Sequence, residues 1–438
     1  MTGHAGTRRG GWARPLYSTA LYLLAPLIWR RVWREWVPTH PRRERLGLID
    51  APIHERPAIW LHAASVGEVL AARPLLEALR ARYPDHRLVV TTMTATGAER
   101  IEALAKQLGG TEGPGEVSHY FVPLDFPGAA RRFVTRLRPS LALFFETELW
   151  PNLLHACHRH GVPVAVVNGR LSAKAMRGYR RIGVLLADAL GKVDWLAAKS
   201  EQDAERFRQL GMAPERIATV GSLKFDISAN DGSLVESERL RARLGRRPVW
   251  IAGSTHPGED EQVLAAHARL RERYPGVLLI LVPRHPQRFD DVAALCRHHG
   301  ERLARRSRDE TIEATTTVYL GDTMGELSTL YGAADVAFVG GSLVPIGGHN
   351  LLEPAALGVP VLSGPHLANF SDVADVMREV DALIEVADAA ALGVALGALL
   401  DAPAERRRLA NAGRAVVEAN RGALARTLDG LERLLPQR

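Results

Sequence analysis

The sequence lacks the signatures of several protein classes. It contains only two cysteines, Cys157 and Cys296, far apart in 438 residues, which excludes a disulfide framework and favours a reducing compartment. No Gly-x-Gly-x-x-Gly fingerprint follows the first predicted strand, where Ala63–Glu68 stand instead, so a dinucleotide-dependent oxidoreductase is excluded. Basic motifs interleaved with aromatic residues are missing, which argues against the usual nucleic-acid-binding modules. Internal repeats and low-complexity tracts are absent as well.

The composition fits two well-packed domains with an excess of positive charge. At 438 residues the chain is too long for one ordinary hydrophobic core and fits two domains of about 200 residues each. Hydrophobic residues make up 46% of the chain, which supports two such cores. The net charge of +7 indicates attraction to something acidic: nucleic acid, a phosphorylated metabolite or an anionic membrane surface. Charge alone does not choose among these three.

The N-terminal segment is predicted to associate with a membrane. Residues 15–29 carry no charge and are flanked on both sides by arginines. The stretch is too short for a comfortable span of the bilayer, and the residues that follow, 29–36, contain no small-residue cleavage site of a signal peptide. Tryptophan and arginine together are typical of the lipid headgroup boundary. We expect residues 12–37 to form a membrane-associated anchor, interfacial or barely spanning, with the rest of the chain in the cytoplasm. The alternative is a core helix of the first domain.

Beyond residue 50, short aliphatic runs alternate with helical segments in two series. This alternation is typical of parallel sheets covered on both faces, and it predicts two doubly wound, Rossmann-like α/β domains facing a cleft. The domains are expected at residues 41–228 and 229–438, after an anchor at residues 1–40. Basic amphipathic helices from Pro403 onward are placed to pack back across the first domain. The predicted strands are residues 58–63, 88–92, 141–145, 162–167 and 195–198 in the first series, and 249–253, 277–282, 318–320, 336–339 and 359–362 in the second.

A glycine-rich turn in the second domain predicts a nucleotide site. The strand at residues 336–339 leads into residues 340–348, which contain two glycine pairs, and then into a helix that opens on Glu353. Glycine lets the backbone approach a ligand closely, and the amides of a helix start point toward anionic or hydroxyl oxygens. The Glu353 carboxylate would then accept from two vicinal ribose hydroxyls. Alternatively, Asn350 caps the helix and Glu353 closes a capping box.

The loop after the first strand of the first domain carries a candidate general base. Ligands of such sheets bind beyond the carboxyl ends of the strands, and Ser65–Glu68 open a helix at this edge. Gly67 permits close approach of the backbone, and Glu68 is placed to take a proton from an acceptor hydroxyl. The alternative is structural, because Ser65 and Glu68 also have the spacing of a capping box.

Two further loops of the first domain bring charged groups to the same edge. Glu146 and Glu148 follow the strand at residues 141–145 and point the same way if the extended backbone continues to Glu148. One of them would contact substrate while the other holds structure. Lys224 closes the domain near the hinge, where it would meet a phosphate or carboxylate; an ordinary surface lysine is the alternative.

Strand ends in the second domain add cationic and amide donors. Arg284 and His285 follow the strand at residues 277–282, where a phosphate or nucleobase would lie. An arginine makes a forked contact to phosphate that a lysine cannot make. Gly325–Leu327 follow the strand at residues 318–320, and their backbone would read the edge of a base. Several such loops at the strand ends of one sheet are hard to explain by structural needs alone.

In their order along the chain, these motifs resemble those of the 3-deoxy-D-manno-octulosonic acid (Kdo) transferases of lipid A biosynthesis. The resemblance covers nearly the whole chain from the N-terminal segment onward. A glutamate-rich tryptophan motif, combined with the glycine-rich turn of the second domain, is characteristic of this family among two-domain glycosyltransferases of the GT-B type. The matching motifs are Ser65–Glu68, Glu146–Asn152, Gly221–Asp226, Pro283–His285, Gly325–Leu327 and Gly347–Pro354.

The resemblance implies inverting transfer of Kdo from CMP-Kdo to the phosphorylated, acylated glucosamine disaccharide lipid IVA, in lipopolysaccharide biosynthesis at the cytoplasmic face of the inner membrane. The family's base matches Glu68, and its two proposed transition-state stabilisers match Glu146 and Lys224. We expect no cofactor beyond the donor and no nucleic-acid partner. Departures from the family pattern are small, at two leucines of the last motif. The CMP contacts of the family match Arg284, His285, Gly325, Glu326, Leu327, Asn350, Leu351, Leu352 and Glu353.

Two alternatives stay open from the residues. The histidines of residues 155–160 would suggest a metal, although histidines on a solvated helix are the expectation, and no metal is needed if Arg284, Lys224 and helix-start amides neutralise the leaving phosphate. A related GT-B nucleotide-sugar enzyme, such as an epimerase, would keep the pocket of the second domain but would not need the N-terminal anchor.

Overall fold

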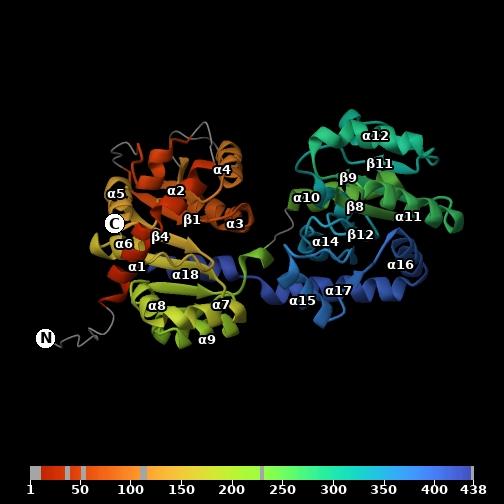
Figure 1. The fold of residues 1–438 in the computed structure, drawn as a ribbon. Helices are drawn as coiled ribbons and strands as arrows, with labels where there is room; N and C mark the ends of the chain where they lie inside the picture. The colour runs from red at the N-terminus through yellow and green to blue at the C-terminus, as the bar shows by residue number, and fades with distance from the viewer. Residues whose placement is uncertain (1–10, 35–39, 51–55, 109–115, 227–230, 436–438) are drawn as a thin grey trace. The chain divides into compact units, whose positions relative to one another are not determined.

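The chain forms two compact units, which a computed structural model describes over residues 11–34, 40–50, 56–108, 116–226 and 231–435. The first unit comprises Met1–Asp226 together with Gly422–Arg438, and the second comprises Ile227–Arg421. Each unit is built around its own seven-stranded parallel sheet (Figure 1). The predicted pair of doubly wound α/β domains is therefore present in the described residues.

In the first unit the strand order is β3-β2-β1-β4-β5-β6-β7, and every neighbouring pair is parallel. The order reverses between β1 and β4. Ligands of doubly wound sheets bind beyond the carboxyl ends of the strands at such a switch point. The strands are β1 (Ala58–His62), β2 (Arg87–Thr92), β3 (Val117–Phe121), β4 (Pro139–Phe145), β5 (Val164–Gly169), β6 (Trp195–Ala198) and β7 (Ile217–Thr219).

Helices cover both faces of this sheet because successive strand residues point to opposite sides. Trp60 packs against Phe133 and Phe144 in the core under one face, while Leu61 belongs to the core under the other. Helices α5, α6, α8 and α9 line the first core, and α3 and α4 line the second. The helices are α3 (Val66–Arg82), α4 (Ala95–Gln107), α5 (Pro127–Leu137), α6 (Pro151–Arg159), α7 (Ala173–Tyr179), α8 (Gly183–Leu190) and α9 (Glu201–Gln209).

The second unit repeats this plan with the strand order β10-β11-β9-β8-β12-β13-β14. Its switch point lies between β8 and β12, which pair in parallel. The strands are β8 (Val249–Thr255), β9 (Leu278–Pro283), β10 (Leu303–Arg305), β11 (Val318–Leu320), β12 (Val336–Val339), β13 (Val361–Ser363) and β14 (Leu383–Glu385). The helices are α10 (Asp231–Leu244), α11 (Asp260–Arg273), α12 (Phe289–His298), α13 (Leu327–Gly332), α14 (Leu352–Ala356), α15 (Ser371–Glu379), α16 (Ala389–Asp401) and α17 (Pro403–Asn420).

The C-terminal segment corrects the expected domain boundaries. The sequence assigned all residues from 229 onward to the second domain, but Gly422–Arg438 belong to the first unit. Helix α18 (Ala423–Glu432) buries Leu428 and Leu431 in the core beside α3, among the elements of the first unit (Figure 1). The Asp226 carboxylate accepts hydrogen bonds from the backbone N–H groups of Gly422 and Leu424 at 2.6 and 2.5 Å, which fixes the returning chain.

The N-terminal segment forms two short helices, α1 (Ala13–Leu23) and α2 (Ala25–Arg34), that pack on the first unit with one face. The Oδ1 atom of Asn152, a buried residue at the start of α6, accepts hydrogen bonds from Arg14 and Ser18 at 3.2 Å each. Within the described part of the chain, no helix is long and apolar enough to cross a membrane. The barely spanning form of the predicted anchor is therefore not supported. The outward face remains apolar, with exposed side chains at Trp12, Leu16, Tyr22, Leu23, Leu24 and Leu27.

Candidate active site

Glu68 lies in the first turn of α3, directly beyond the carboxyl end of β1 at the switch point. Its carboxylate accepts hydrogen bonds from the Ala64 N–H at 2.8 Å and the Ser65 hydroxyl at 3.0 Å, while the Ser65 hydroxyl accepts from the Glu68 N–H at 3.3 Å. The capping interaction expected as the alternative is thus present. Burial nevertheless raises the pKa of Glu68 to about 7, with a further rise from the negative charges of Glu148 and Glu146. A carboxyl that titrates near neutrality is suited to general-base work, so the capping interaction is compatible with the predicted role of Glu68.

Glu146 and Glu148 reach Glu68 through a turn and not through a continued strand. β4 ends at Phe145, and Glu146 adopts a left-handed conformation with φ of 59°, so the expected extended backbone to Glu148 is wrong. A non-glycine residue in this region is strained, and such residues concentrate at functional sites. Asn168, at the end of the neighbouring strand β5, has a φ of 54°, a conformation that asparagine adopts more readily than glutamate. Both carboxylates lie where their negative charges raise the pKa of Glu68.

His62 is a site residue that the sequence analysis missed. It is fully buried at the end of β1, and its Nδ1 atom lies 3.1 Å from the carbonyl oxygen and 3.0 Å from the hydroxyl of Thr91. Its Nε2 atom faces the Glu148 carboxylate at 3.7 Å, while Trp150 donates a 2.7 Å hydrogen bond to the same group. Burial disfavours the charged form of Glu148, but His62 and Trp150 outweigh it and lower the pKa of Glu148. Glu148 therefore stays ionised beside Glu68.

Lys224 lies at the same edge of the sheet in the short 3-10 helix η4 (Leu223–Phe225). The side-chain oxygen of Asn168 accepts a hydrogen bond from the Leu223 N–H at 3.2 Å and so ties this turn to the end of β5. The Lys224 side chain is half-buried, unlike that of an ordinary surface lysine. Glu68, Glu146 and Lys224 thus lie beyond the carboxyl ends of three strands of the first sheet, β1, β4 and the edge strand β7.

In the second unit, three histidines lie around Arg284 beyond the carboxyl ends of β8, β9 and β12. His256, His285 and His349 lie within the electrostatic reach of its guanidinium, and so does the Glu353 carboxyl. The sequence analysis predicted Arg284, His285 and Glu353 but missed the other two histidines. His256 lies directly after β8, and this position at a strand end could have identified it as a site residue from the sequence.

The glycine-rich loop after β12 is held by a carboxylate of the protein itself. Glu259, fully buried at the start of α11, accepts backbone hydrogen bonds from His256, Gly341, Ser342 and Leu343 at 2.7–3.2 Å. The backbone N–H groups of residues 341–343 therefore do not face a ligand, contrary to the simplest reading of a glycine-rich turn. Instead, the loop is fixed in place beside His256 at the switch point.

Asn350 and Glu353 are hydrogen-bonded to each other at the start of α14, although without the capping box expected as the alternative, because the N-cap residue is Leu351. The Asn350 side chain accepts a hydrogen bond from the Leu352 N–H at 3.1 Å and donates one to the Glu353 carboxylate at 3.3 Å. Burial raises the pKa of Glu353, while Asn350 and Arg284 oppose the rise. Leu351 and Leu352 are fully buried, so their side chains belong to the core and only their backbone is available to a nucleotide.

The loop Gly325–Leu327 is fixed by an ion pair. Arg306 contacts both carboxylate oxygens of Glu326 at 2.5 and 2.8 Å, which lowers the pKa of Glu326. Gly325 is exposed with a φ of 83°. Because the Glu326 carboxylate is occupied, the predicted contact to a base would run through the backbone of this loop. Among the residues described, no group of three or more His, Cys, Asp or Glu side chains is arranged to hold a metal ion.

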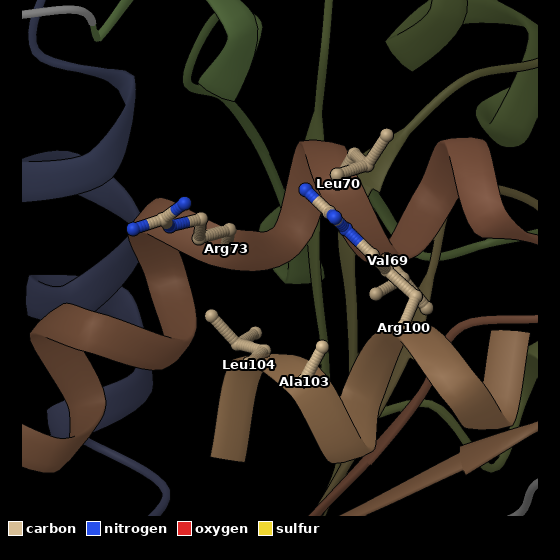
Figure 2. A pocket seen from close by; sticks show the side chains of 6 residues that line it. All are labelled: Val69, Leu70, Arg73, Arg100, Ala103 and Leu104. Carbon is tan, nitrogen blue, oxygen red and sulfur yellow. The ribbon is translucent and has the colours of Figure 1, made fainter. Parts of the chain in front are cut away.

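A small groove between α3 and α4 is lined by arginine and aliphatic side chains, beginning with Val69, the residue after Glu68. Val69, Leu70 and Arg73 line it from α3, and residues 100, 103 and 104 line it from α4 (Figure 2). Arg73 makes an ion pair with Glu77 at 2.7 Å. Figure 2 shows the side chains of Arg73 and Arg100 among the aliphatic side chains that line the groove.

Two doubly wound domains, one with a near-neutral carboxyl and the other with an arginine among histidines at its switch point, are an arrangement typical of two-domain enzymes that bind nucleotides. Residues 40–227 match the family model "3-Deoxy-D-manno-octulosonic-acid transferase (kdotransferase)". The 3-deoxy-D-manno-octulosonic acid transferase of Haemophilus influenzae is 41% identical over 96% of this chain and 98% of that protein. The transferase of Bordetella pertussis is 40% identical over 96% and 99%.

The chain therefore belongs to the Kdo transferase family and is a glycosyltransferase, which confirms the resemblance seen in the sequence. The crystal structure of UDP-GlcNAc 2-epimerase from Neisseria meningitidis bound to UDP-GlcNAc has a TM-score of 0.54 and 12% identity, covering 86% of this chain and all of that one. At this identity the likeness shows the shared GT-B type of fold alone. The fold is thus shared with the epimerase, whereas the sequence is similar to the Kdo transferases.

Proposed function

We propose that the protein is an inverting glycosyltransferase that moves Kdo from CMP-Kdo to lipid IVA in lipopolysaccharide biosynthesis. The observation that carries this proposal is Glu68, a half-buried carboxyl with a pKa of about 7 at the switch point of the first unit. Membership of the Kdo transferase family supports the sugar that is transferred. The chemistry of the residues around Glu68 supports the acceptor, and that of the residues around Arg284 supports the donor nucleotide.

In the proposed reaction, an acceptor hydroxyl attacks the anomeric carbon of Kdo as CMP leaves. Glu68 takes the proton of that hydroxyl, which is possible only while its carboxylate is ionised. The transition state has oxocarbenium character, so the nearby carboxylate of Glu146 stabilises the positive charge that develops on the sugar. Lys224 offers a cation for the carboxylate or phosphate of the donor. Displacement from the face opposite to the leaving group inverts the anomeric centre.

The second unit is proposed to hold the CMP moiety. Arg284 neutralises the phosphate, because a guanidinium makes forked contacts to phosphate oxygens. His285 lies beside it, and Glu353 is positioned by Asn350 to accept from the ribose hydroxyls. The backbone of Gly325–Leu327 is assigned to the cytosine edge. No metal is required in this scheme, since protein cations carry the neutralising charge.

The acidic, acylated acceptor and the membrane are matched by two surfaces of the first unit. The groove between α3 and α4 combines arginines with aliphatic side chains. The outward face of α1 and α2 exposes apolar side chains such as Leu23, which is 78% exposed. We infer that these helices lie in the headgroup region at the cytoplasmic side of the inner membrane, in agreement with the interfacial form of the predicted anchor.

Product analysis tests the proposed function. Purified full-length protein is incubated with CMP-Kdo and lipid IVA, and the lipid is analysed by mass spectrometry. We expect Kdo-bearing lipid together with free CMP. Release of CMP without a Kdo-bearing lipid would contradict the acceptor, and an epimerised sugar nucleotide would support the alternative enzyme class.

A further inference from the structure

His256 and His349 form a hydrogen-bonded pair that has no role in the proposed reaction. Their Nε2 atoms lie 2.8 Å apart, and their rings are stacked with centroids 5.0 Å apart at an angle of 10°. His285 packs edge-on against His256 at 5.3 Å. The loop after β12 packs tightly against the pair, because a Cβ atom on Gly341 would lie 2.9 Å from the His349 ring. Gly341 has a φ of 68°, so both its conformation and the space beside it favour glycine.

The geometry of the pair limits how many protons it holds. Each neutral imidazole has one N–H group and one nitrogen lone pair. A hydrogen bond between two Nε2 atoms uses the N–H group of one ring and the lone pair of the other. One extra proton fits on the Nδ1 atom of the donating ring and strengthens the bond by making it charge-assisted. A second extra proton would set two N–H groups against each other. The pair therefore accommodates one additional proton and no more.

The charges around the pair keep it neutral while no anion is bound. Arg284, His285 and Arg288 face it from the segment that follows β9. Burial lowers the pKa of His349 to about 3, and the positive charge of Arg284 adds to this effect. Burial, His285 and the two arginines lower the pKa of His256 to about 4.

The acidic groups nearby are already engaged. Glu259 accepts its four backbone hydrogen bonds, and Asp260 is bound by Thr255 and Arg288. The Glu353 carboxylate, from the start of α14, accepts from Asn350. Arg288 is paired with Asp260, whereas Arg284 makes no ion pair with a carboxylate among the described residues, so an anion bound beside Arg284 would supply its counter-charge.

We propose that His256 and His349 form a donor-binding pair that takes up one proton when the anionic end of the sugar nucleotide binds beside Arg284. This inference rests on the proposed function for the place of the donor. The phosphate brings negative charge next to groups that otherwise disfavour an imidazolium, so proton uptake becomes favourable on binding. The protonated pair then adds a second cation to that of Arg284 against the departing CMP. The proton comes from the solvent and forms one N–H bond at the Nδ1 lone pair of the donating ring, and no other covalent bond of the protein changes.

Isothermal titration of the full-length protein with CMP tests the inference. Titrations at pH 7.5, in two buffers with different ionisation enthalpies, give the number of protons taken up. Between about pH 7.5 and 8.5 the CMP phosphate, with a second pKa of about 6, is almost fully ionised, so nearly all of the uptake belongs to the protein. We expect close to one proton per CMP at the lower end of this range. The affinity for CMP should fall by up to about tenfold for each rise of one pH unit, as linkage to one proton requires.

Variants assign the proton to the pair. In His349→Gln and His256→Gln, proton uptake should be lost and the pH dependence of CMP affinity should flatten. His298→Gln, at an exposed histidine of α12, is the matched control and should behave as the wild type. CMP binding by the wild type without proton uptake, or undiminished uptake in either pair variant, would overturn the inference and leave the donor site standing. Failure of the wild type to bind CMP would instead contradict the donor site itself.

Discussion

At the scale of single residues, the first unit prepares one carboxyl for proton transfer. A general base works only when deprotonated, so kcat/KM for transfer should rise with pH through about 7, where Glu68 titrates, and level off above it. The ionised Glu148 contributes to this value by its negative charge. Glu148 is in turn held by His62 and Trp150.

Replacing Glu148 with glutamine tests this electrostatic role. Removing the negative charge should lower the pKa of Glu68, so the acidic limb of the pH–kcat/KM profile should move to lower pH. The profile is measured with CMP-Kdo and lipid IVA. Glu77→Gln, at an exposed position of α3, the helix that carries Glu68, is the matched control and should leave the midpoint of the profile unchanged. An unshifted midpoint in Glu148→Gln would show that Glu148 does not tune the base.

Arg284 is the residue whose loss should weaken nucleotide binding most. Arg284→Ala removes the guanidinium that lies among the three histidines, and hydrogen bonds to charged groups contribute about 1.5–3 kcal/mol. We expect the Kd for CMP to rise by at least about tenfold in titration calorimetry. The Kd of Arg284→Lys should lie between those of the wild type and Arg284→Ala, because a lysine keeps the positive charge but lacks the forked geometry. An unaltered Kd would remove Arg284 from the phosphate site.

At the scale of elements, Glu259 holds two loops together at the switch point of the second unit. Glu259→Ala leaves buried N–H groups without their acceptor, each at a cost of about 1–3 kcal/mol. The thermal unfolding temperature should fall by about 5 °C or more, and CMP affinity should fall with it, as followed by circular dichroism and calorimetry. Glu261→Ala, an exposed neighbour, should change neither. Wild-type stability in Glu259→Ala would show that the loop does not depend on this carboxylate.

The inner strands were predictable from the sequence, whereas the edge strands were not. Central strands are buried on both faces and therefore appear as continuous aliphatic runs, as in Leu141–Phe145. The four strands that were missed, β3, β7, β10 and β14, are the outermost strands of the two sheets. They are short or alternate with polar residues, as in Val117-Ser-His-Tyr-Phe121, because one side of an edge strand is only partly covered.

The candidate site was predictable only in part, for a related reason. Charged residues just after an aliphatic run, such as Glu68 and Arg284, stand out because the fold places strand ends at the ligand edge. His62 lies inside a buried strand and could not be told from a core histidine. Glu259 resembles an ordinary helix-start carboxylate, since three of its bonding partners lie more than 80 residues away in the sequence. Its role depends on tertiary structure alone.

At the scale of the whole molecule, the N-terminal helices are expected to attach the enzyme to its lipid substrate. Replacing Leu16, Leu23 and Leu27 together with serine removes exposed aliphatic surface that would enter the headgroup region. Binding of the full-length protein to anionic phospholipid vesicles should weaken by at least about tenfold in a sedimentation assay. Val394→Ser, at a side chain 74% exposed on α16, is the control and should bind as the wild type. Equal binding by both variants would contradict this attachment.

The most direct test of the account is the rate of Kdo transfer to lipid IVA by the wild type and by Glu68→Gln, followed by mass spectrometry of the lipid. We expect a Kdo-bearing product from the wild type. The variant should transfer more slowly by about a hundredfold or more, with its CMP affinity and thermal unfolding unchanged. A wild type that forms no Kdo-bearing lipid would contradict the proposed reaction, and a variant that transfers at the wild-type rate would contradict the role of Glu68 as its base.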